Sequence, residues 1–494
     1  MGVAGMTFFP ESSKRESPLV PSKDSPRIDW RLAILFVTSL VLCWPATSTQ
    51  AQDVSRADVG KWLDTRASAP NFKADDVLSS GDLERLRPFV PPGYLEQLNF
   101  PSFKMKVVAV RSHQPRQDYV NCTERYQAQV RLAPDGALTN HICGQPFSNA
   151  SLNPSDPVSG LKAAWNFELR WQNYGEFDAS TVYVPMYFGG THDLTSDSAL
   201  QMPPDQWLSG INLQTKLPPN IGPYVQGGGT VRRTFSSSYQ RLYFTHLAQA
   251  ADKGGVLDVL NAKAFFWKEF SGFITPYDLR GQVFITYRYS DFHHADDSWI
   301  YDPTTRRVRR FSAEEKSDSF LGTDETLNDF YSFSGHVLDW NWKFLGWRDL
   351  VSVMDSAHLD THTYGPNGNI PDDVWSLRRF AVVERTPRNP ANPYGDVITF
   401  WDAENWTPWM ELAFDHHAKL WRVLVYVSSW SEDLQPWSQI NRGTHVTIVQ
   451  GGQTIDVQNH RCTLFLTFGR GSPDVIKGRA NRLFDPSNLE QAHR

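Results

Sequence analysis

The chain has 494 residues, of which 40% are hydrophobic and 21% charged, and its formal net charge at pH 7 is −6. An acidic chain has no overall attraction for polyphosphates, so the composition excludes a general nucleic-acid-binding role. The length allows two or three domains of about 150 residues each, or one large β domain.

An apolar run near the N-terminus, LAILFVTSLVLCW at residues 32–44, follows basic residues and precedes small residues that end at Ala51. This is the layout of a secretory signal peptide, and the run is shorter than the roughly 18 apolar residues of a membrane-spanning helix. The stretch before the run is long for a signal peptide, and Leu42 stands where a lipoprotein signal has a small residue. We expect residues 1–51 to be removed on export, with an uncleaved or lipidated anchor as the alternative.

Two short helical patterns follow, SRADVGKWLDTRA and SSGDLERLRPF, the second with Ser80 placed as a helix cap. From about Phe103 the periodicity changes to two. The segments RYQAQVRLA and WNFELRWQ alternate apolar and polar residues, so both predict half-buried antiparallel strands. The predicted organisation is a helical N-terminal segment at 52–100, a single β domain at 101–470 and a C-terminal tail at 471–494.

Three cysteines follow the signal segment: Cys122, Cys143 and Cys462. An oxidising compartment favours a disulfide between Cys122 and Cys143. However, the predicted hairpin turns at Asp135-Gly136 and sets these two cysteines about 20 Å apart along the strand. Because a disulfide needs Cα atoms within about 7 Å, the bridge requires a bend or a longer loop, and both outcomes stay open.

Four further segments are apolar on both faces: TVYVPMYF (181–188), GQVFITYRY (281–289), KLWRVLVYV (419–427) and CTLFLTF (462–468). A strand that is apolar on both sides has to be covered on both, by a helix, another sheet or a bound apolar molecule. Turn signals occur at PDG, YDPTT, YGD and QGGQ, and residues 202–229 form a long irregular excursion. The sequence therefore predicts a mainly β fold with few helices, built as one large, strongly curved antiparallel sheet.

The segment YDPTTRRVRRF, which starts at Tyr301, places four arginines around Val308, but acidic residues outnumber basic ones over 301–330. A nucleic-acid patch needs clustered, uncompensated positive charge, so the segment does not predict one. We expect a β-strand whose arginines pair with the acidic loop that follows. The residues expected in these contacts are Arg306, Arg310, Asp318 and Asp324.

Other patterns that could carry chemistry are histidine pairs and clustered carboxylates. The pairs His293-His294 and His416-His417 are read as polar turn residues, because adjacent residues on a strand point to opposite faces and cannot bind one metal ion. The segment WDAENWTPWMELAFDHH combines carboxylates with tryptophans, as a sugar-cleaving site would, although ordinary strand-edge carboxylates are the simpler interpretation. No nucleophile elbow, phosphate loop or dinucleotide fingerprint is present, so the sequence predicts no enzyme, no metal site and no cofactor. The four carboxylates are Asp402, Glu404, Glu411 and Asp415.

The segments PYDLRGQVFITYRYSD, DDSWIYDPTTRRVRRF, KSDSFLGTDETLNDFYSFSG and LDWNWKFLGW together resemble the hallmark region of bacterial envelope proteins classed as outer-membrane lipoprotein-sorting-like. Within that group they are most similar to domain-of-unknown-function family 1329. Matches continue upstream in LRPFVPPGYLEQLNFPSFKM and downstream in the segment from RRFAVVERTP to AFDHHAKLW, so the resemblance covers roughly residues 80–430. One departure is the turn YDPTT, where relatives commonly carry an apolar YxPAL.

This resemblance implies a fold similar to the periplasmic carrier LolA and its receptor LolB, a half-open β-barrel whose concave face accepts acyl chains beneath a lid of helices or loops. It also implies a periplasmic location, with association to the outer membrane as an option, and an outer-membrane channel and an RND-type transporter as partners. The expected function is a non-enzymatic carrier or adaptor for a lipid or other hydrophobic molecule. The alternatives are an envelope scaffold that docks such a partner and, third, a glycan-active hydrolase.

Aromatic residues make up 13% of the chain and would supply the wall of such a binding site. Most of the rings belong to the core, but strands that are apolar on both faces leave a concave wall for a lipid-like ligand. If Val308 points into the concavity, Arg306 and Arg310 flank it and meet an acidic headgroup. The residues expected in the wall are Trp165, Trp171, Phe284, Tyr287, Phe311 and Trp342.

Overall fold

One large β-sheet dominates the structure, a computed structural model. The structure describes residues 54–65, 69–170, 176–188, 230–311, 314–358, 361–433, 443, 445–470 and 475–489. The strands of the large sheet are β1 (Val77–Ser79), β2 (Lys104–Val107), β5 (Glu176–Phe188), β6 (Thr230–Tyr243), β7 (Phe265–Thr275), β8 (Val283–Tyr289), β9 (Asp297–Asp302), β10 (Arg307–Phe311), β11 (Trp340–Ser352), β14 (Val374–Pro387), β15 (Asp396–Asp402), β16 (Pro408–Phe414), β17 (Leu420–Trp430), β18 (Thr447–Asp456) and β19 (Arg461–Arg470).

The strand order along the sheet is β1-β2-β14-β15-β16-β17-β18-β19-β5-β6-β7-β8-β9-β10, and β11 pairs with β14 as a branch. Neighbouring strands run antiparallel, except that β2 and β14 run parallel. The mainly β prediction is therefore confirmed, with one parallel pairing in a sheet expected to be antiparallel throughout. Among the described strands the order begins at β1 and ends at β10 without closing into a barrel.

The alternation in β17 shows how the sequence assigns the two faces of this sheet. Val423 and Val425 pack against the N-terminal part of the chain, whereas Leu424 and Tyr426 point the other way. We call the face with Val423 the outer face and the face with Tyr426 the inner face. Both faces of the strand are buried, as its apolar pattern predicts.

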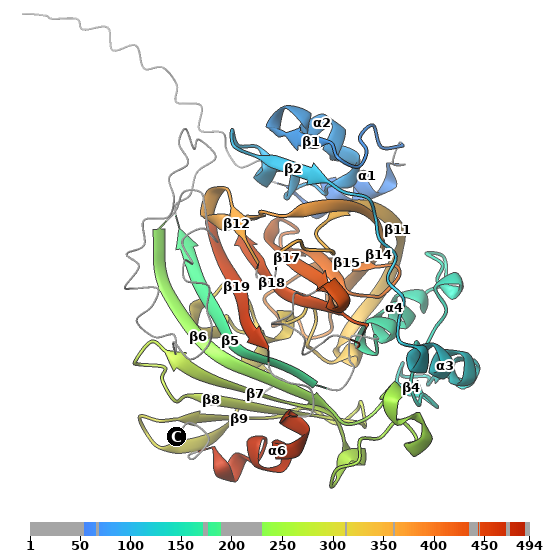
Figure 1. The fold of residues 1–494 in the computed structure, drawn as a ribbon, viewed down its shortest axis with the longest axis vertical. Helices are drawn as coiled ribbons and strands as arrows, with labels where there is room; N and C mark the ends of the chain where they lie inside the picture. Colours follow the sequence, from blue (N-terminus) through green and yellow to red (C-terminus); the bar gives the residue numbers. More distant parts are fainter. Residues whose placement is uncertain are drawn as a thin grey trace, which may run out of the picture. The chain divides into compact units, whose positions relative to one another are not determined.

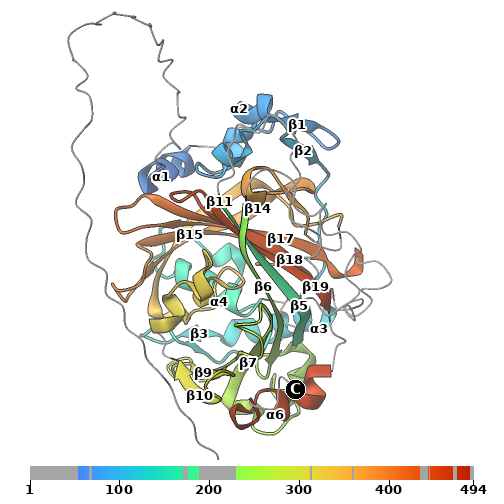
Figure 2. The same ribbon diagram turned by 90° about the vertical axis from the view of Figure 1, so that its left-hand side faces the viewer.

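Helices and short segments cover both faces (Figures 1 and 2). The N-terminal elements pack on the outer face of β14 to β19, and the C-terminal helix packs on the outer face of β6 to β9. On the inner side, one helix packs against β14 and β15 and also against β6 and β7, so it fills the bend of the sheet (Figure 2). The helices are α1 (Arg56–Asp64), α2 (Leu83–Leu86), α3 (Gln117–Tyr126), the inner helix α4 (Ser159–Glu168) and α6 (Val475–Leu483).

The remainder of the inner face is covered by residues 314–336, which we call the cover segment. It runs from β10 to β11 and has no regular strand or α-helix, only the 3-10 turns η9 (Glu314–Ser317), η10 (Phe320–Gly322) and η11 (Leu327–Asp329). Its apolar residues Phe320 and Phe330 pack on Phe235 and Phe273 of the sheet. The cover segment therefore packs its apolar side chains against the inner face of the sheet.

Two predicted strands are helices in the structure. RYQAQVRLA lies at the end of α3 and in the 3-10 turn that follows, and only the two-residue strands β3 (Arg131–Leu132) and β4 (Leu138–Thr139) form the hairpin. The first half of WNFELRWQ lies in α4, which is buried almost all round, so alternation along it carries no information on its secondary structure. The strong helix formers Ala163 and Ala164 just before it are the better signal.

Two smaller predictions also need correction. The cap of the second N-terminal helical segment is Ser79 rather than Ser80, because the hydroxyl of Ser79 accepts a hydrogen bond from the backbone N–H of Gly81. The expected turn at QGGQ lies inside β18, where the two glycines allow close strand contact. A Cβ on Gly452 would lie 2.1 Å from the carbonyl oxygen of Val425.

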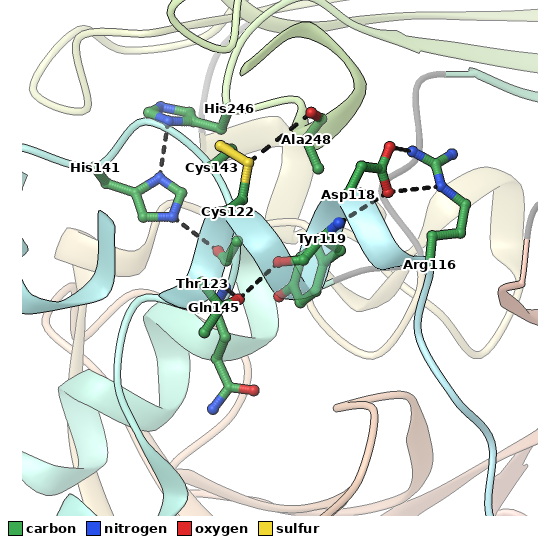
Figure 3. The surroundings of a disulfide bond; sticks show 11 residues. Arg116, Asp118, Tyr119, Cys122, Thr123, His141, Cys143, Gln145, His246 and Ala248 are labelled. Atoms are coloured by element: carbon green, nitrogen blue, oxygen red, sulfur yellow. Dashed lines mark hydrogen bonds and ion pairs between the residues drawn. A yellow bond between two sulfur atoms is a disulfide. The ribbon is translucent and has the colours of Figure 1, made fainter. Parts of the chain in front are cut away.

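The structure joins Cys122 on α3 to Cys143, with their Cα atoms 5.5 Å apart (Figure 3). The separation expected from an extended hairpin does not arise, because a helix advances about 1.5 Å per residue where a strand advances about 3.3 Å. Next to the disulfide, Nδ1 of His141 lies 3.0 Å from Nδ1 of His246. Cys462 is free and buried on β19.

Candidate functional site

A cavity of about 100 Å³ lies between the inner face and the cover segment. Its wall is mostly aromatic and aliphatic, with hydroxyl groups and one carboxyl group among the apolar atoms. Strands β6, β7, β17, β18 and β19 supply the floor, and the cover segment supplies the roof. The lining residues are Phe235, Ser237, Tyr239, Ser271, Phe320, Glu325, Phe330, Tyr331, Tyr426, Val449, Gly451, Gly452, Phe465 and Thr467.

A second, smaller cavity of about 30 Å³ adjoins the first, because both are lined by Tyr239, Ser271, Phe320 and Phe330. The rings of Phe320 and Phe330 have their centroids 5.5 Å apart in an edge-to-face contact. For comparison, an engineered protein cavity of about 150 Å³ binds benzene. The larger cavity therefore has room for a segment of only a few carbon atoms, and Phe320 and Phe330 belong to the walls of both cavities.

Glu325 is the carboxyl group in the cavity wall, and its residue is 5% exposed. The hydroxyl of Thr454 donates a hydrogen bond of 2.6 Å to Oε1 of Glu325. Burial raises the pKa of Glu325 well above its usual range, and the nearby carboxylates of Asp329 and Glu411 raise it further. The raised pKa favours the protonated form of Glu325, in which the carboxyl group can donate a hydrogen bond.

The residue before it, Asp324, fixes the cover segment to β19 and is itself 2% exposed. Its Oδ1 lies 2.6 Å from the guanidinium of Arg461, and its Oδ2 accepts a hydrogen bond of 2.9 Å from the hydroxyl of Thr463. Arg461 also lies 3.0 Å from Asp456. Burial raises the pKa of Asp324, with Arg461 opposing that effect.

Further along, Asp329 fixes the cover segment to the strands on the other side of the cavity. Its Oδ2 accepts a hydrogen bond of 2.8 Å from the hydroxyl of Tyr394, and that hydroxyl accepts one of 2.7 Å from Arg422. The carbonyl oxygen of Asp329 accepts a hydrogen bond of 3.1 Å from Tyr426. All four residues are buried in the interior or nearly so.

Beneath Asp329, the guanidinium of Arg385 donates two hydrogen bonds to Glu411, which in turn accepts one from the hydroxyl of Ser332. The indole N–H of Trp401 donates to the same hydroxyl at 3.0 Å. Burial raises the pKa of Glu411 to about 7 despite Arg385, because Asp329 adds a second negative charge. Acidic groups thus gather between the cover segment and the sheet.

A third anchor holds the two ends of the cover segment to the β8–β9 region. Asp296 is buried and accepts hydrogen bonds from Arg288 at 2.8 Å, Lys316 at 2.7 Å and His336 at 2.7 Å. The charges of Arg288 and Lys316, together with the hydrogen bond from His336, hold the pKa of Asp296 well below its usual range, against the effect of burial. The cover segment is therefore tied to the sheet by buried charges at both ends and in the middle.

Of the four expected wall residues whose side chains the structure describes, Phe284 alone lines one of the two cavities beside the cover segment. Phe284 lines the smaller cavity, whereas Tyr287 faces the other side of β8, where its hydroxyl bonds the carbonyl of Phe484. Trp165 and Trp342 lie in the core around α4. Trp171 and the side chain of Phe311 lie outside the described residues.

Arg306, Val308 and Arg310 do not share one face of a strand as predicted. Arg306 has a φ of +53° and lies in the turn before β10, so it is not part of the strand. Val308 is 43% exposed and Arg310 lies 3.3 Å from Asp297 with 72% of its side chain exposed. The acidic loop pairs instead with arginines of distant strands, as Asp324 does with Arg461, and Asp318 is exposed.

The histidine pairs lie in turns, as expected. His293 bonds Asp291 and Asp135, and His416 bonds the backbone carbonyl of Asn392. Within the described part of the chain, no group of three or more His, Cys, Asp or Glu residues could hold a metal ion. Among those same residues, no helix has the length and hydropathy needed to cross a membrane.

The four carboxylates considered for glycan chemistry do not line the two cavities beside the cover segment. Asp402 and Glu404 both accept hydrogen bonds from the guanidinium of Arg378, at 2.7 and 2.9 Å. Glu411 binds Arg385, and Asp415 accepts backbone N–H groups in the turn after β16. Their observed contacts are structural.

Comparison with known proteins places the chain in a family. A family model described as a protein of unknown function, DUF1329, matches residues 77–221 and 224–490. The chain belongs to the DUF1329 family. A search of curated proteins finds no match for this DUF1329 protein.

Solved structures that resemble this DUF1329 protein include a domain from Vibrio parahaemolyticus named for outer membrane lipoprotein sorting and a DUF1329 family protein from Desulfovibrio piger. The identities are 15% and 14%, each with a TM-score of 0.40, and each alignment covers 68% of this chain and 100% of the other. A LolA superfamily protein from Nitrosomonas europaea is 13% identical with a TM-score of 0.31, over 65% of this chain and 96% of that one.

Sequence reasoning missed the buried charges of the DUF1329 protein. Arg385 on β14 and Arg422 on β17 are buried, and Arg422 is the one arginine of its strand; the half-buried Arg461 on β19 contacts the buried Asp324 and Asp456. A lone arginine within a strand that is apolar on both faces is the available signal, because a buried charge requires a partner. The acidic residues between positions 324 and 329 include the partners of these arginines, because Asp324 contacts Arg461 and Asp329 lies near Arg385.

Proposed function

We propose that this DUF1329 protein is an exported periplasmic carrier or adaptor that binds a lipid or other hydrophobic molecule between the inner face and the cover segment. The observation that carries this proposal is the largely apolar cavity of about 100 Å³ beneath the cover segment. Concave, mostly apolar sites with a few polar groups are typical of small-molecule binding. No covalent chemistry is required of the lining residues.

The size of the cavity favours reversible binding. Burying about four methylene groups contributes about 3 kcal/mol before the cost of association is subtracted. A ligand held in the larger cavity alone therefore binds weakly and leaves quickly. A longer chain gains more binding free energy only if it displaces Phe320 and Phe330 and enters the smaller cavity as well.

The proposed setting is the bacterial envelope. The apolar run at residues 32–44, with basic residues before it and small residues after it, supports export. We propose that the ligand is exchanged with an outer-membrane channel or an RND-type transporter. Fractionating cells that produce the full chain, followed by N-terminal sequencing of the periplasmic form, tests the export step; a chain confined to the cytoplasm would contradict it.

The binding function is tested by extracting the purified protein with organic solvent and identifying the extract by mass spectrometry, together with uptake of a fluorescent fatty-acid probe and of an uncharged apolar dye. Ser271→Phe places a phenyl ring where both cavities meet and should abolish uptake. Ser155→Phe adds the same ring at an exposed site and serves as the matched control. A protein that is reproducibly empty and takes up no probe would refute the carrier function.

A second candidate function, an envelope scaffold, is favoured by the edge strand β10. Among the described strands β10 pairs with β9 alone, and its residues from Arg307 to Arg310 are exposed on both faces. Such an edge can accept a further strand from a partner that brings acidic side chains. Co-purification of envelope proteins with the wild type but not with an Arg307→Glu, Arg309→Glu variant would support this function.

A further inference from the structure

The charges around the larger cavity determine which polar group a ligand can carry. Among the described residues that line it, none is lysine or arginine, and Glu325 is the one carboxyl group. Tyrosines and serines supply the remaining polar atoms. An anionic headgroup would thus find no cation in the wall.

The arginines that contact the cover segment or the groups bonded to it already bond other residues. Arg385 donates two hydrogen bonds to Glu411, at 2.8 and 3.0 Å. Arg422 donates to the hydroxyl of Tyr394, at 2.7 Å. Arg461, the first residue of β19, lies between the carboxylates of Asp324 and Asp456. Releasing Arg385 or Arg461 for a ligand would leave a buried acid without its partner, which is costly.

Glu325 itself is positioned to contact a ligand. Its Oε1 accepts the hydroxyl of Thr454, and the described residues offer no hydrogen-bond partner for its Oε2. The nearby carboxylates of Asp329 and Glu411 oppose a negative charge at this position. A protonated carboxyl here can donate a hydrogen bond to an oxygen atom of a ligand, and the neighbouring acids Asp329 and Glu411 disfavour a further negative charge beside it.

We propose, on the basis of the carrier function above, that the cavity selects an uncharged amphiphile with a hydroxyl or carbonyl oxygen that accepts a hydrogen bond from Glu325, and that it discriminates against fatty-acid anions. The apolar part of the ligand lies among Phe235, Phe330 and Phe465. The selectivity comes from the absence of a free cation in the described wall and from the excess of buried acid beside it.

The test is displacement of the uncharged dye N-phenyl-1-naphthylamine from the purified protein at pH 7.5 by 1-decanol and by decanoate, which share a chain length and differ in charge. Decanol should displace the dye at a concentration at least tenfold lower than decanoate. Glu325→Gln keeps an uncharged donor and should retain this preference. Glu325→Leu should weaken decanol binding about tenfold, while Asp318→Asn, an exposed change in the same cover segment, should alter nothing.

The outcomes separate the two proposals. Equal or tighter binding of decanoate by the wild type overturns the selectivity while leaving the carrier function in place. A Glu325→Leu variant that folds, as judged by its circular dichroism, and keeps the full preference for decanol also overturns it. If neither compound nor the dye binds the wild type, the carrier function fails, and the selectivity fails with it.

Discussion

Arg385 and Glu411 lie face to face inside the sheet, joined by hydrogen bonds of 2.8 and 3.0 Å, with 1% and 0% of their side chains exposed. Arg385 also lies 3.8 Å from Asp329 of the cover segment. One buried arginine thus forms ion pairs with two carboxylates from different parts of the chain. It couples the stability of the sheet to the position of the cover segment.

Replacing Arg385 by methionine removes the shared cation and leaves two buried acids. We expect the free energy of unfolding to fall by about 3–5 kcal/mol at pH 8, because breaking a buried ion pair leaves an uncompensated charge. At pH 5 the loss should be smaller, since carboxyl groups freed of Arg385 bind protons there. Urea denaturation at both pH values measures this, with exposed Arg307→Met as control; equal losses at pH 5 and pH 8 would contradict it.

Glu411 gives a pH dependence of definite sign. Its pKa is about 7 in the folded protein against a usual value of 4.5, so its contribution to stability is fully present below about pH 4.5 and is lost as the pH rises to 7. Glu411→Gln cannot ionise and escapes this loss. Relative to the wild type, the variant should gain up to about 3 kcal/mol in free energy of unfolding between pH 4.5 and pH 8. A constant difference across this range would show that Glu411 titrates normally.

The disulfide between Cys122 and Cys143 closes a loop with a sequence separation of 21. On the chain-entropy model such a loop stabilises the folded protein by about 3 kcal/mol. Cys122→Ala, Cys143→Ala should therefore lower the free energy of unfolding by about that amount. A reducing agent should lower the free energy of unfolding of the wild type by a similar amount and leave that of the double variant unchanged. The buried Cys462 is a free thiol in both proteins.

Phe320 separates the two cavities, and its ring contacts Phe330 at 5.5 Å and Phe284 at 5.8 Å between centroids. Phe320→Ala should join the cavities and improve the binding of a dodecyl chain more than that of a hexyl chain, at a cost of about 3 kcal/mol in stability. Phe284→Ala enlarges the smaller cavity alone and serves as the control. Dye displacement by dodecanol and by hexanol measures the ratio of their affinities. If that ratio is the same in Phe320→Ala as in the wild type, the ring does not limit the length of the bound chain.

Much of the fold follows from patterns that short segments carry on their own. The two-faced strand KLWRVLVYV is β17, with valines on the outer face and Leu424 and Tyr426 on the inner face. The segment around Trp165 was wrongly predicted as a strand because α4 is buried nearly all round. A helix without a polar face does not show the helical period of 3.6 residues in its sequence. Local patterns thus predict strands that are half or fully buried better than they predict a central helix.

The site was less predictable, because its parts are distant in sequence. Glu325 and Thr454 are 129 positions apart, and Asp329 and Tyr394 are 65 apart. A single sequence supplies the charges but not the register of the strands that bring them together. The arginines of the RRVRR run were conspicuous but exposed, whereas the single arginine of β17, Arg422, was the buried one.

The exposed strand β10 also has a consequence for the behaviour of the protein at high concentration. If the β10 strands of two copies paired antiparallel about Arg309, that residue would face its counterpart in the other copy, and Arg310 would face Val308. Like charges directly opposite one another across two strands are destabilising. The arginines therefore favour solubility by preventing the sheet from growing from one molecule into the next, and replacing them with threonine should promote ordered aggregates.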